Sequence, residues 1–151
     1  MTIEEEIKQS KFSSAYEKLA FNLIYSTRWL EDFLKKRLSK HDLTMQQYNI
    51  LRILRGSRPQ PLSTLQIRER LIDKMSDTSR IVDRLLIKKL VTKKTNRTDN
   101  RMVDVRISEK GLSLLRKIDD IDQQLAQFLS KISEKEAATV SDLLDKMHAR
   151  P

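Results

Sequence analysis

The sequence predicts a mainly α-helical fold with one small β-hairpin, and two features of the chain lead to this prediction. Apolar residues recur at steps of three and four along most of the 151 residues, and only two glycines and three prolines interrupt them. Between residues 91 and 107 the pattern changes to an alternation of apolar and polar residues, which is typical of strands. The length suits one domain, and we expect a single domain over residues 1–151.

A long amphipathic helix is expected near the N-terminus. It is predicted over Ser13–Ser39 by an apolar stripe that comprises Tyr16, Leu19, Ala20, Leu23, Thr27, Leu30, Leu34 and Leu38. A second helix is expected to begin at Thr44, which can form a capping box with Gln47, and to end at Gly56. The prolines in Arg58–Pro61 then require an extended connection.

Two short helices separated by a tight break are expected next. Ser63 and Gln66 can form a second capping box at the start of the first helix. After the break at Ile72–Met75, Ser76 is the expected N-cap of the second helix. The inner face of this second helix comprises Ile81, Val82, Leu85 and Leu86.

A β-hairpin and two further helices are expected to complete the chain. The alternation in Val103–Ile107 predicts a half-buried strand, and Val91–Lys94 is its expected partner across a polar tip. Helical periodicity resumes after Gly111, with a stripe of Leu115, Ile118, Leu125, Phe128, Leu129 and Ile132. Ser133 and Glu136 can form a third capping box, which opens the last helix.

This order of elements predicts a winged helix-turn-helix, because a pair of short helices is followed directly by a hairpin. The winged lobe is expected over residues 44–111. Long helices over residues 1–40 and 112–151 are expected to mediate dimerisation, because their apolar edges are longer than a domain this small can cover. Packing of these helices within one chain is the alternative.

Positive charge is concentrated in the predicted lobe. Residues 63–111 hold 13 Lys/Arg and 7 Asp/Glu, a net +6 of the chain's +9. Such a localised basic region is typical of nucleic-acid binding, although a solvated lysine-rich surface gives the same count. The second helix of the pair enters a DNA major groove by its N-terminal residues. The residues expected there are Ser76, Asp77, Thr78, Ser79, Arg80 and Arg84.

The hairpin is expected to act as a DNA-binding wing. Lys93, Lys94, Arg97 and Arg101 flank or occupy its tip, where Asp99 is the opposing acidic residue. An arginine on a flexible tip can reach into a narrow minor groove, where the negative potential is strongest. An ordinary charged hairpin is the alternative, but the preceding helix pair favours DNA binding.

The hairpin and its surroundings resemble a known family. Leu90-Val91, Asp99-Asn100-Arg101 and Ile107-Ser108-Glu109-Lys110-Gly111 are similar to the wing signature of the MarR/SlyA-type winged helix-turn-helix transcriptional regulators. In that signature Asp-x-Arg precedes a strand, and Leu-Thr-x-x-Gly opens the next helix. Upstream, Leu43-Thr44 and Gln47-Tyr48 resemble the second helix of the family.

The resemblance implies a homodimeric, sequence-specific regulator of transcription that binds a pseudo-palindromic operator. It implies that Arg101 is the wing-tip residue in the minor groove and that Asp99 orients the wing by pairing with basic groups. Two positions depart from the family. Lys89 stands where glycine is usual, so the preceding helix is expected to end without a left-handed cap. Ser108 replaces threonine and still supplies a cap for the next helix.

The resemblance also implies a ligand site, because small aromatic acids bind regulators of this family between the outer helices and the DNA-binding lobe. Trp29 and Tyr48 are the candidate pocket residues, and the effector is expected to be a small aromatic or anionic molecule. A role in the hydrophobic core is the alternative for both aromatic side chains. We therefore expect a repressor that such a ligand releases from double-stranded DNA.

Other kinds of chemistry are disfavoured. The chain has no cysteine, which excludes disulfides, thiolate metal sites and thiol redox switches. His41 and His148 lie far apart and form no metal motif, so neither a metal nor a cofactor is expected. No phosphate-binding glycine loop or set of nucleophile partners suggests an enzyme. Without a signal peptide or an apolar span of ~20 residues, the protein is expected to be cytoplasmic.

Two alternatives from other classes stay open at this point. A winged helix can serve as a protein-interaction module, in which case the basic face docks on another protein. The chain can also be a nonspecific architectural DNA-binding protein, which has no preference among duplex sequences.

Overall fold

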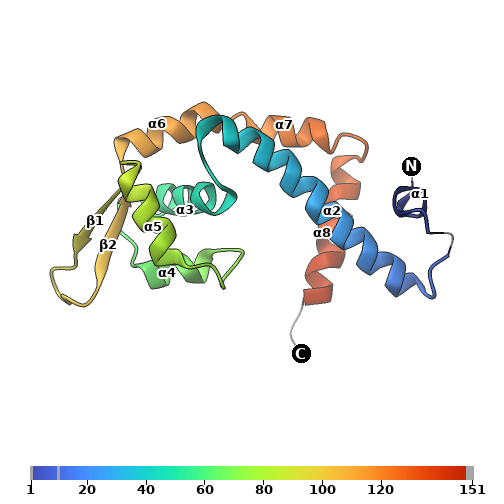
Figure 1. The fold of residues 1–151 in the computed structure, drawn as a ribbon, viewed down its shortest axis with the longest axis horizontal. Helices are drawn as coiled ribbons and strands as arrows, with labels where there is room; N and C mark the ends of the chain where they lie inside the picture. Colours follow the sequence, from blue (N-terminus) through green and yellow to red (C-terminus); the bar gives the residue numbers. More distant parts are fainter. Residues whose placement is uncertain (1, 10, 149–151) are drawn as a thin grey trace. The chain divides into compact units, whose positions relative to one another are not determined.

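The computed structural model describes residues 2–9 and 11–148, which divide into two compact units, residues 1–114 and 115–151 (Figure 1). The elements of the first unit are α1 (Ile3–Ile7), α2 (Ala15–Leu38), the 3-10 helix η1 (Ser39–His41), α3 (Met45–Gly56), α4 (Thr64–Arg70), α5 (Thr78–Ile87), β1 (Val91–Thr95) and β2 (Val103–Ile107). The remaining helices are α6 (Glu109–Ile118), which spans the boundary, α7 (Ile121–Phe128) and α8 (Glu134–His148). The predicted fold class, mainly α with a β-hairpin, is confirmed.

Three helices, α3, α4 and α8, begin where the capping residues predict. The three predicted capping boxes are present, in the pairs Thr44–Gln47, Ser63–Gln66 and Ser133–Glu136. In each pair the hydroxyl accepts from one backbone N–H and the longer side chain accepts from another, so two groups without a helical partner are satisfied. Ser14 caps α2 in the simpler way, by accepting from the backbone N–H of Glu17 at 3.1 Å.

Two helical segments differ from the prediction. The short helix α1 was not predicted, because five residues are too few to show a periodic stripe. The helix expected to continue from Leu115 to Ile132 is interrupted after Ile118, and α7 begins at Ile121. Two consecutive aspartates, Asp119 and Asp120, occupy the break, and aspartate favours helix starts and turns over helix interiors.

The core of the winged lobe lies among α3, α4, α5 and the hairpin. Its most completely buried side chains, each less than 2% exposed, include Ile50, Leu51, Leu54, Ile67, Val82, Leu85, Val91 and Val105. The strands pair antiparallel, with Val91 opposite Ile107 and Thr95 opposite Val103. The connection over Arg58–Pro61 is not extended as predicted: it forms a turn, in which the backbone N–H of Gln60 donates to the carbonyl of Ser57 at 2.9 Å. Just after it, Leu62 exchanges backbone hydrogen bonds of 3.0 and 2.9 Å with Val105. This bridge fixes the α3–α4 connection against β2.

The end of α5 corrects one prediction. Lys89 has a φ of 61°, so the helix does end in a left-handed residue although no glycine is present. The backbone N–H of Leu90 donates to the carbonyl of Leu85 at 3.0 Å, and that of Lys89 donates to the carbonyl of Leu86 at 2.9 Å. These two bonds form a Schellman motif, which satisfies the last carbonyls of the helix and outweighs the preference of lysine for negative φ.

The start of α6 depends on glycine for a different reason. A Cβ atom on Gly111 would lie 2.3 Å from the carbonyl oxygen of Leu90 and 2.8 Å from a side-chain carbon of Ile107. The Ser108 hydroxyl accepts from the backbone N–H of Gly111 at 3.0 Å, so Ser108 supplies the expected cap. The same hydroxyl donates to the carbonyl of Lys89 at 2.8 Å. The start of α6 is therefore held against the base of the hairpin by the Ser108 hydroxyl and by the close approach of Gly111 to Leu90.

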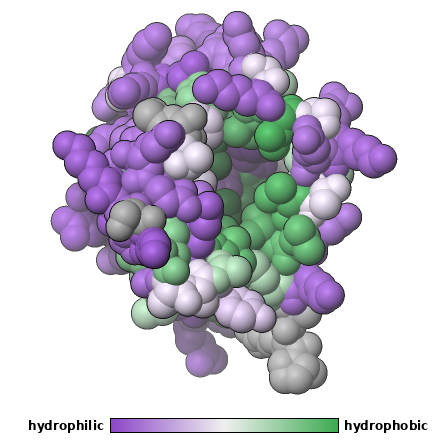
Figure 2. All heavy atoms as spheres, turned by 90° about the vertical axis from the view of Figure 1, so that its right-hand side faces the viewer, coloured by the Kyte–Doolittle hydropathy of each residue, from purple (hydrophilic) through white to green (hydrophobic). Residues whose placement is uncertain are grey.

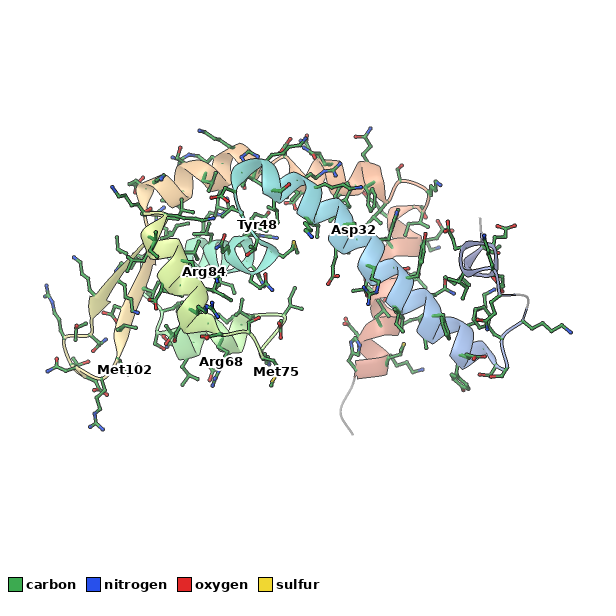
Figure 3. The ribbon with its side chains drawn as sticks, in the orientation of Figure 1. Asp32, Tyr48, Arg68, Met75, Arg84 and Met102 are labelled. Atoms are coloured by element: carbon green, nitrogen blue, oxygen red, sulfur yellow. The ribbon has the colours of Figure 1, made fainter. Side chains whose placement is uncertain are left out.

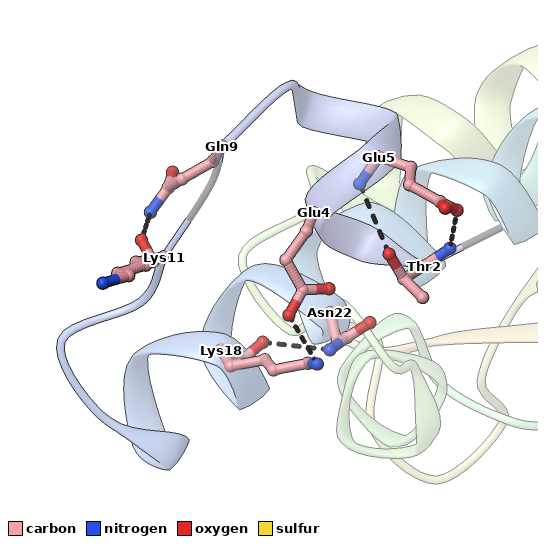
Figure 4. A network of polar contacts seen from close by, with 7 residues as sticks. All are labelled: Thr2, Glu4, Glu5, Gln9, Lys11, Lys18 and Asn22. Carbon is pink, nitrogen blue, oxygen red and sulfur yellow. Dashed lines mark hydrogen bonds and ion pairs between the residues drawn. The ribbon is translucent and has the colours of Figure 1, made fainter.

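The N-terminal helix α1 packs on α2 through a small polar network (Figure 4). Lys18 Nζ on α2 lies 2.6 Å from Glu4 Oε1, and this hydrogen bond lowers the pKa of Glu4. Thr2 and Glu5 form a capping box at the start of α1, and Ile3 is buried beneath it. Partial burial, together with a hydrogen bond to Glu6, raises the pKa of Tyr25 on α2.

Both terminal regions expose apolar side chains. On α2 the exposed members are Tyr16, Leu19, Phe21, Ile24, Tyr25 and Trp29, and in residues 115–148 they are Ile132, Val140, Leu143 and Met147. Figure 2 shows apolar side chains at the surface among the hydrophilic ones. None of the described helices is long and apolar enough to cross a membrane.

Candidate nucleic-acid interface

The N-terminal turn of α5 is built around two aspartates. Asp77 is the N-cap, and its carboxylate accepts from the backbone N–H of Arg80 at 3.1 Å. The prediction that Ser76 is the N-cap is wrong, because the Ser76 hydroxyl instead donates to Asp73 Oδ2 at 2.8 Å. Asp73 Oδ1 also accepts from the backbone N–H of Met75 at 3.0 Å, so the turn before α5 has a fixed shape.

The residues expected on this helix differ in their exposure. Ser79, Arg80 and Arg84 are exposed, so their side chains are available to a ligand. The cap Asp77 is also exposed, and Ser76 is partly buried. Thr78 is buried, at 5% exposure, and its hydroxyl lies 3.4 Å from the carbonyl of Ser76 as a donor. The structure therefore directs Thr78 to packing and leaves two arginines and a serine at the surface.

A hollow of about 210 Å³ adjoins this turn and brings in residues that sequence reasoning missed. It is lined by Thr64, Leu65, Arg68, Ser76, Asp77, Thr78 and Ser79. Arg68 and Thr64 lie one helical turn apart on α4, where Arg68 is exposed and Thr64 is partly buried. Figure 3 shows Arg68 and Arg84 on the neighbouring helices α4 and α5 and Met75 in their connection. The outward face of α4 is visible in its periodicity and could have been predicted.

The wing places its basic residues in different surroundings. Lys93 is held by an ion pair, with its Nζ 2.8 Å from Asp83 Oδ1 on α5. Lys94 and Arg97 are exposed, and the side chain of Arg101 is 95% exposed at the tip. Lys93 therefore fixes the hairpin to α5, whereas the other three cations extend into solvent.

Asp99 lies beneath Arg101 in the tip. Its Oδ1 accepts from the backbone N–H of Arg101 at 2.9 Å and lies 3.7 Å from Arg101 Nε. Asp99 thus contacts the residue two positions along the tip. The ion pair itself is exposed and weak, so the backbone hydrogen bond is the firmer of the two contacts.

The far end of α5 is tied to the α2–α3 connection. Lys88 Nζ lies 3.0 Å from Asp42 Oδ2 and 3.2 Å from Gln47 Oε1, and it also donates to the carbonyl of Asp42. Gln47 is buried, at 4% exposure. The orientation of α5 is thereby set by a contact between residues more than 40 positions apart in the sequence, which periodicity cannot predict.

The two candidate ligand-pocket residues have different environments. Trp29 is 44% exposed on α2, whereas Tyr48 is buried in α3 with the guanidinium of Arg52 5.7 Å from its ring centre. Neither lines the hollow beside α5. Neither lines a second hollow of about 230 Å³, which is formed by Leu54, Arg58, Pro59, Gln60, Arg106 and Ile107.

A helix pair, a hairpin fixed to its second helix and exposed arginines on both define a winged helix-turn-helix protein. No protein-family model matches the sequence. The chain is 29% identical over 131 residues to the HTH-type transcriptional regulator MhqR of Bacillus subtilis (strain 168), an alignment that covers 86% of this chain and 89% of that protein.

Solved structures of MarR-type regulators are also similar to this chain. The MarR transcription factor from Planctomyces limnophilus is 27% identical, with a TM-score of 0.68 and coverage of 91% of this chain and 98% of that one. The S. aureus MepR–DNA complex contains a chain that is 23% identical, with a TM-score of 0.75 and coverage of 91% and 97%. The predicted resemblance to the MarR-type regulators is confirmed.

Proposed function

We propose that this chain is a sequence-specific, DNA-binding regulator of transcription that binds a pseudo-palindromic operator as a homodimer. The observation that carries the proposal is that α5 and the wing belong to one packed lobe, in which Leu85 and Val91 are buried and Lys93 pairs with Asp83. The exposed arginines of both elements can therefore engage the same duplex. The MepR structure, which contains DNA, supports this use of the fold.

The residues divide by task within this proposal. Arg80 and Arg84, exposed on α5, contact base edges or phosphates in the major groove, since arginine can donate two hydrogen bonds to guanine. Arg97 and Arg101 on the wing contact phosphates and the minor groove. Arg68, at the hollow beside α5, adds a phosphate contact from α4.

The homodimer is proposed to form through the terminal helices. The exposed apolar residues of α2 and those of residues 115–148 supply the surface that a second copy would bury. Binding of a small aromatic or anionic effector near Trp29 and Tyr48 is proposed to release the DNA, so that the protein acts as a cytoplasmic repressor. This last step is supported by the resemblance to the family.

The decisive experiment is selection of bound fragments from the source genome, followed by fluorescence anisotropy on the selected duplex. Arg101→Ala is expected to lower affinity by about 1–3 kcal/mol, because a charge-assisted contact to DNA is lost. Arg116→Ala, on α6 outside the proposed interface, is the matched control for loss of one positive charge. Affinity of the wild-type chain should also fall steeply with salt, through release of counterions.

Each alternative has its own outcome in this experiment. A chain that ignores duplex DNA at low salt refutes the proposal and favours a protein-interaction module. Equal affinity for all duplexes also refutes it, and favours an architectural DNA-binding protein. If Arg101→Ala and Arg116→Ala weaken binding equally, the assignment of the wing is wrong.

A further inference from the structure

The side chain of Asn96 accepts three hydrogen bonds in the tip of the wing. Its Oδ1 accepts from the backbone N–H of Thr98 at 2.9 Å, from the Thr98 hydroxyl at 2.6 Å and from the backbone N–H of Asp99 at 3.0 Å. Its backbone N–H donates to the carbonyl of Met102 at 3.0 Å, which closes the hairpin. Asn96 is partly buried, whereas Arg97 and Arg101 are exposed.

A chain of contacts leads from Asn96 to the arginine at the tip. Asn96 fixes the backbone of Asp99, and the Asp99 carboxylate in turn accepts from the backbone N–H of Arg101. The carbonyl of Asp99 also accepts from the backbone N–H of Met102 at 2.9 Å. The backbone of Arg101 is therefore connected to Asn96 through Asp99. Met102, labelled in Figure 3, marks the tip beside Arg101.

The amide of Asn96 is itself held in one orientation by β2. Asn96 Nδ2 donates to Asp104 Oδ1 at 2.8 Å. Because a carboxylate only accepts hydrogen bonds, the NH2 group of Asn96 must face Asp104. The side-chain oxygen of Asn96 then faces Thr98 and Asp99. A charge-assisted hydrogen bond of this kind is stronger than one between neutral groups.

We propose that Asn96, held by Asp104, is the positioning residue of the wing and presents Arg101 to duplex DNA. The inference rests on the proposed function and adds to it, because neither Asn96 nor Asp104 touches DNA in this role. A pre-ordered tip loses less conformational entropy on binding than a free loop does. Asn96 therefore raises DNA affinity by ordering the tip before the protein binds DNA.

A double-mutant cycle tests the proposal. Asn96→Asp places two carboxylates against each other. Asp104→Asn leaves an acceptor for the Asn96 amide, and the double variant exchanges donor and acceptor at unchanged net charge. Asn96→Asp alone is expected to lower DNA affinity by about tenfold, or 1.4 kcal/mol. In the double variant affinity should return to within about threefold of the wild type. Far-UV circular dichroism verifies that each variant is folded.

Charge alone gives a different pattern. If Asn96 acts only through the charge it gains, Asn96→Asp lowers affinity by the same factor in the wild-type background and in the Asp104→Asn background, and the proposal is overturned. Repeating the cycle at higher salt separates the two effects further, since long-range charge effects are screened and a direct hydrogen bond is screened much less.

Hydrogen exchange of the free protein distinguishes failure of this inference from failure of the proposed function. In Asn96→Asp the amides of Thr98, Asp99 and Arg101 should exchange faster, and in the double variant they should return towards wild-type rates. Unchanged exchange in Asn96→Asp overturns the positioning role whatever happens to DNA binding. If exchange responds as expected but Arg101→Ala binds DNA normally, the wing contact of the proposed function is wrong and the ordering role of Asn96 stands without a DNA partner.

Discussion

Gly111 illustrates at the scale of one residue how a backbone contact dictates sequence. The carbonyl of Leu90 leaves no room for a Cβ there, whereas Gly56, at the end of α3, has nothing within 4 Å of the same position. Gly111→Ala is expected to destabilise the fold by about 1–3 kcal/mol, because hairpin and helix must move apart. Urea unfolding monitored by circular dichroism measures the change in the free energy of unfolding.

Gly56→Ala is the matched control, and it should stabilise the fold by about 0.5–1 kcal/mol, since alanine has less backbone entropy to lose in a helix. Equal effects of the two substitutions would show that the contact with Leu90 is not what requires glycine at residue 111.

Lys89 gives a second prediction at this scale, because a left-handed φ of 61° strains any residue with a Cβ. Lys89→Gly is expected to raise the free energy of unfolding by about 0.5–1 kcal/mol. Lys89→Ala retains the Cβ and should leave stability nearly unchanged. If alanine stabilises the fold as much as glycine does, the charge of Lys89 rather than its backbone is the cause.

At the scale of elements, acid stability depends on carboxylates at helix starts. Hydrogen bonds from the backbone and hydroxyl of Ser133 lower the pKa of Glu136 at the start of α8, and Ser13 does the same for Glu17 on α2. A carboxyl whose pKa is lower in the folded state stabilises the fold above its unfolded pKa, here near 4.5. That stability is lost as pH falls through the folded value.

Thermal unfolding between about pH 6 and pH 3 is therefore expected to show a falling Tm in acid. Glu136→Gln removes the titrating group but keeps an acceptor for the backbone, so Tm should depend less on pH below about 4.5. Glu134→Gln, two residues earlier on the same helix, is the control. A pH dependence that is equal in both variants contradicts a role for the Glu136 cap.

The elements also show how much of the fold was predictable from the sequence. The hairpin strands were predictable from the alternation of apolar and polar residues, and the starts of α3, α4 and α8 from capping pairs three residues apart. Both patterns are local in the sequence. The cap of α5 was misplaced, since Ser76 and Asp77 are both good caps and only the hydrogen bond of Ser76 to Asp73 decides between them. The left-handed Lys89 depends on a motif that overrides residue preference.

The candidate interface was predictable in part for the same reason. Charge and element order indicated α5 and the wing, but they could not show that Lys93 is engaged by Asp83 or that Thr78 is buried. Likewise, Asn96 carries no charge, so a search for basic residues overlooks it. Its importance depends on contacts with Thr98, Asp99 and Asp104, which only the folded tip reveals.

At the scale of the whole molecule, the exposed apolar residues of α2 predict the oligomeric state. Ile24 is 57% exposed on this helix. Because burial of such a residue would favour association, Ile24→Glu is expected to place a charge in the proposed dimer interface and to shift the protein towards monomer. Sedimentation equilibrium measures the dissociation constant of the dimer.

The control uses another exposed isoleucine, Ile72, which is 90% exposed in the turn between α4 and α5. Ile72→Glu should leave the dimer constant unchanged, because this turn lies outside the proposed dimer surface. If Ile24→Glu and Ile72→Glu have the same dimer dissociation constant, this face of α2 is not part of the interface.

The left-handed lysine at the end of α5 also sets stability against function. Glycine at residue 89 would relieve the backbone strain, but it would remove a positive charge from the lobe proposed to bind DNA. Stability of the fold and electrostatic attraction to DNA therefore favour different residues at position 89. A stabilised Lys89→Gly variant should associate with DNA more slowly at low salt than the wild type does.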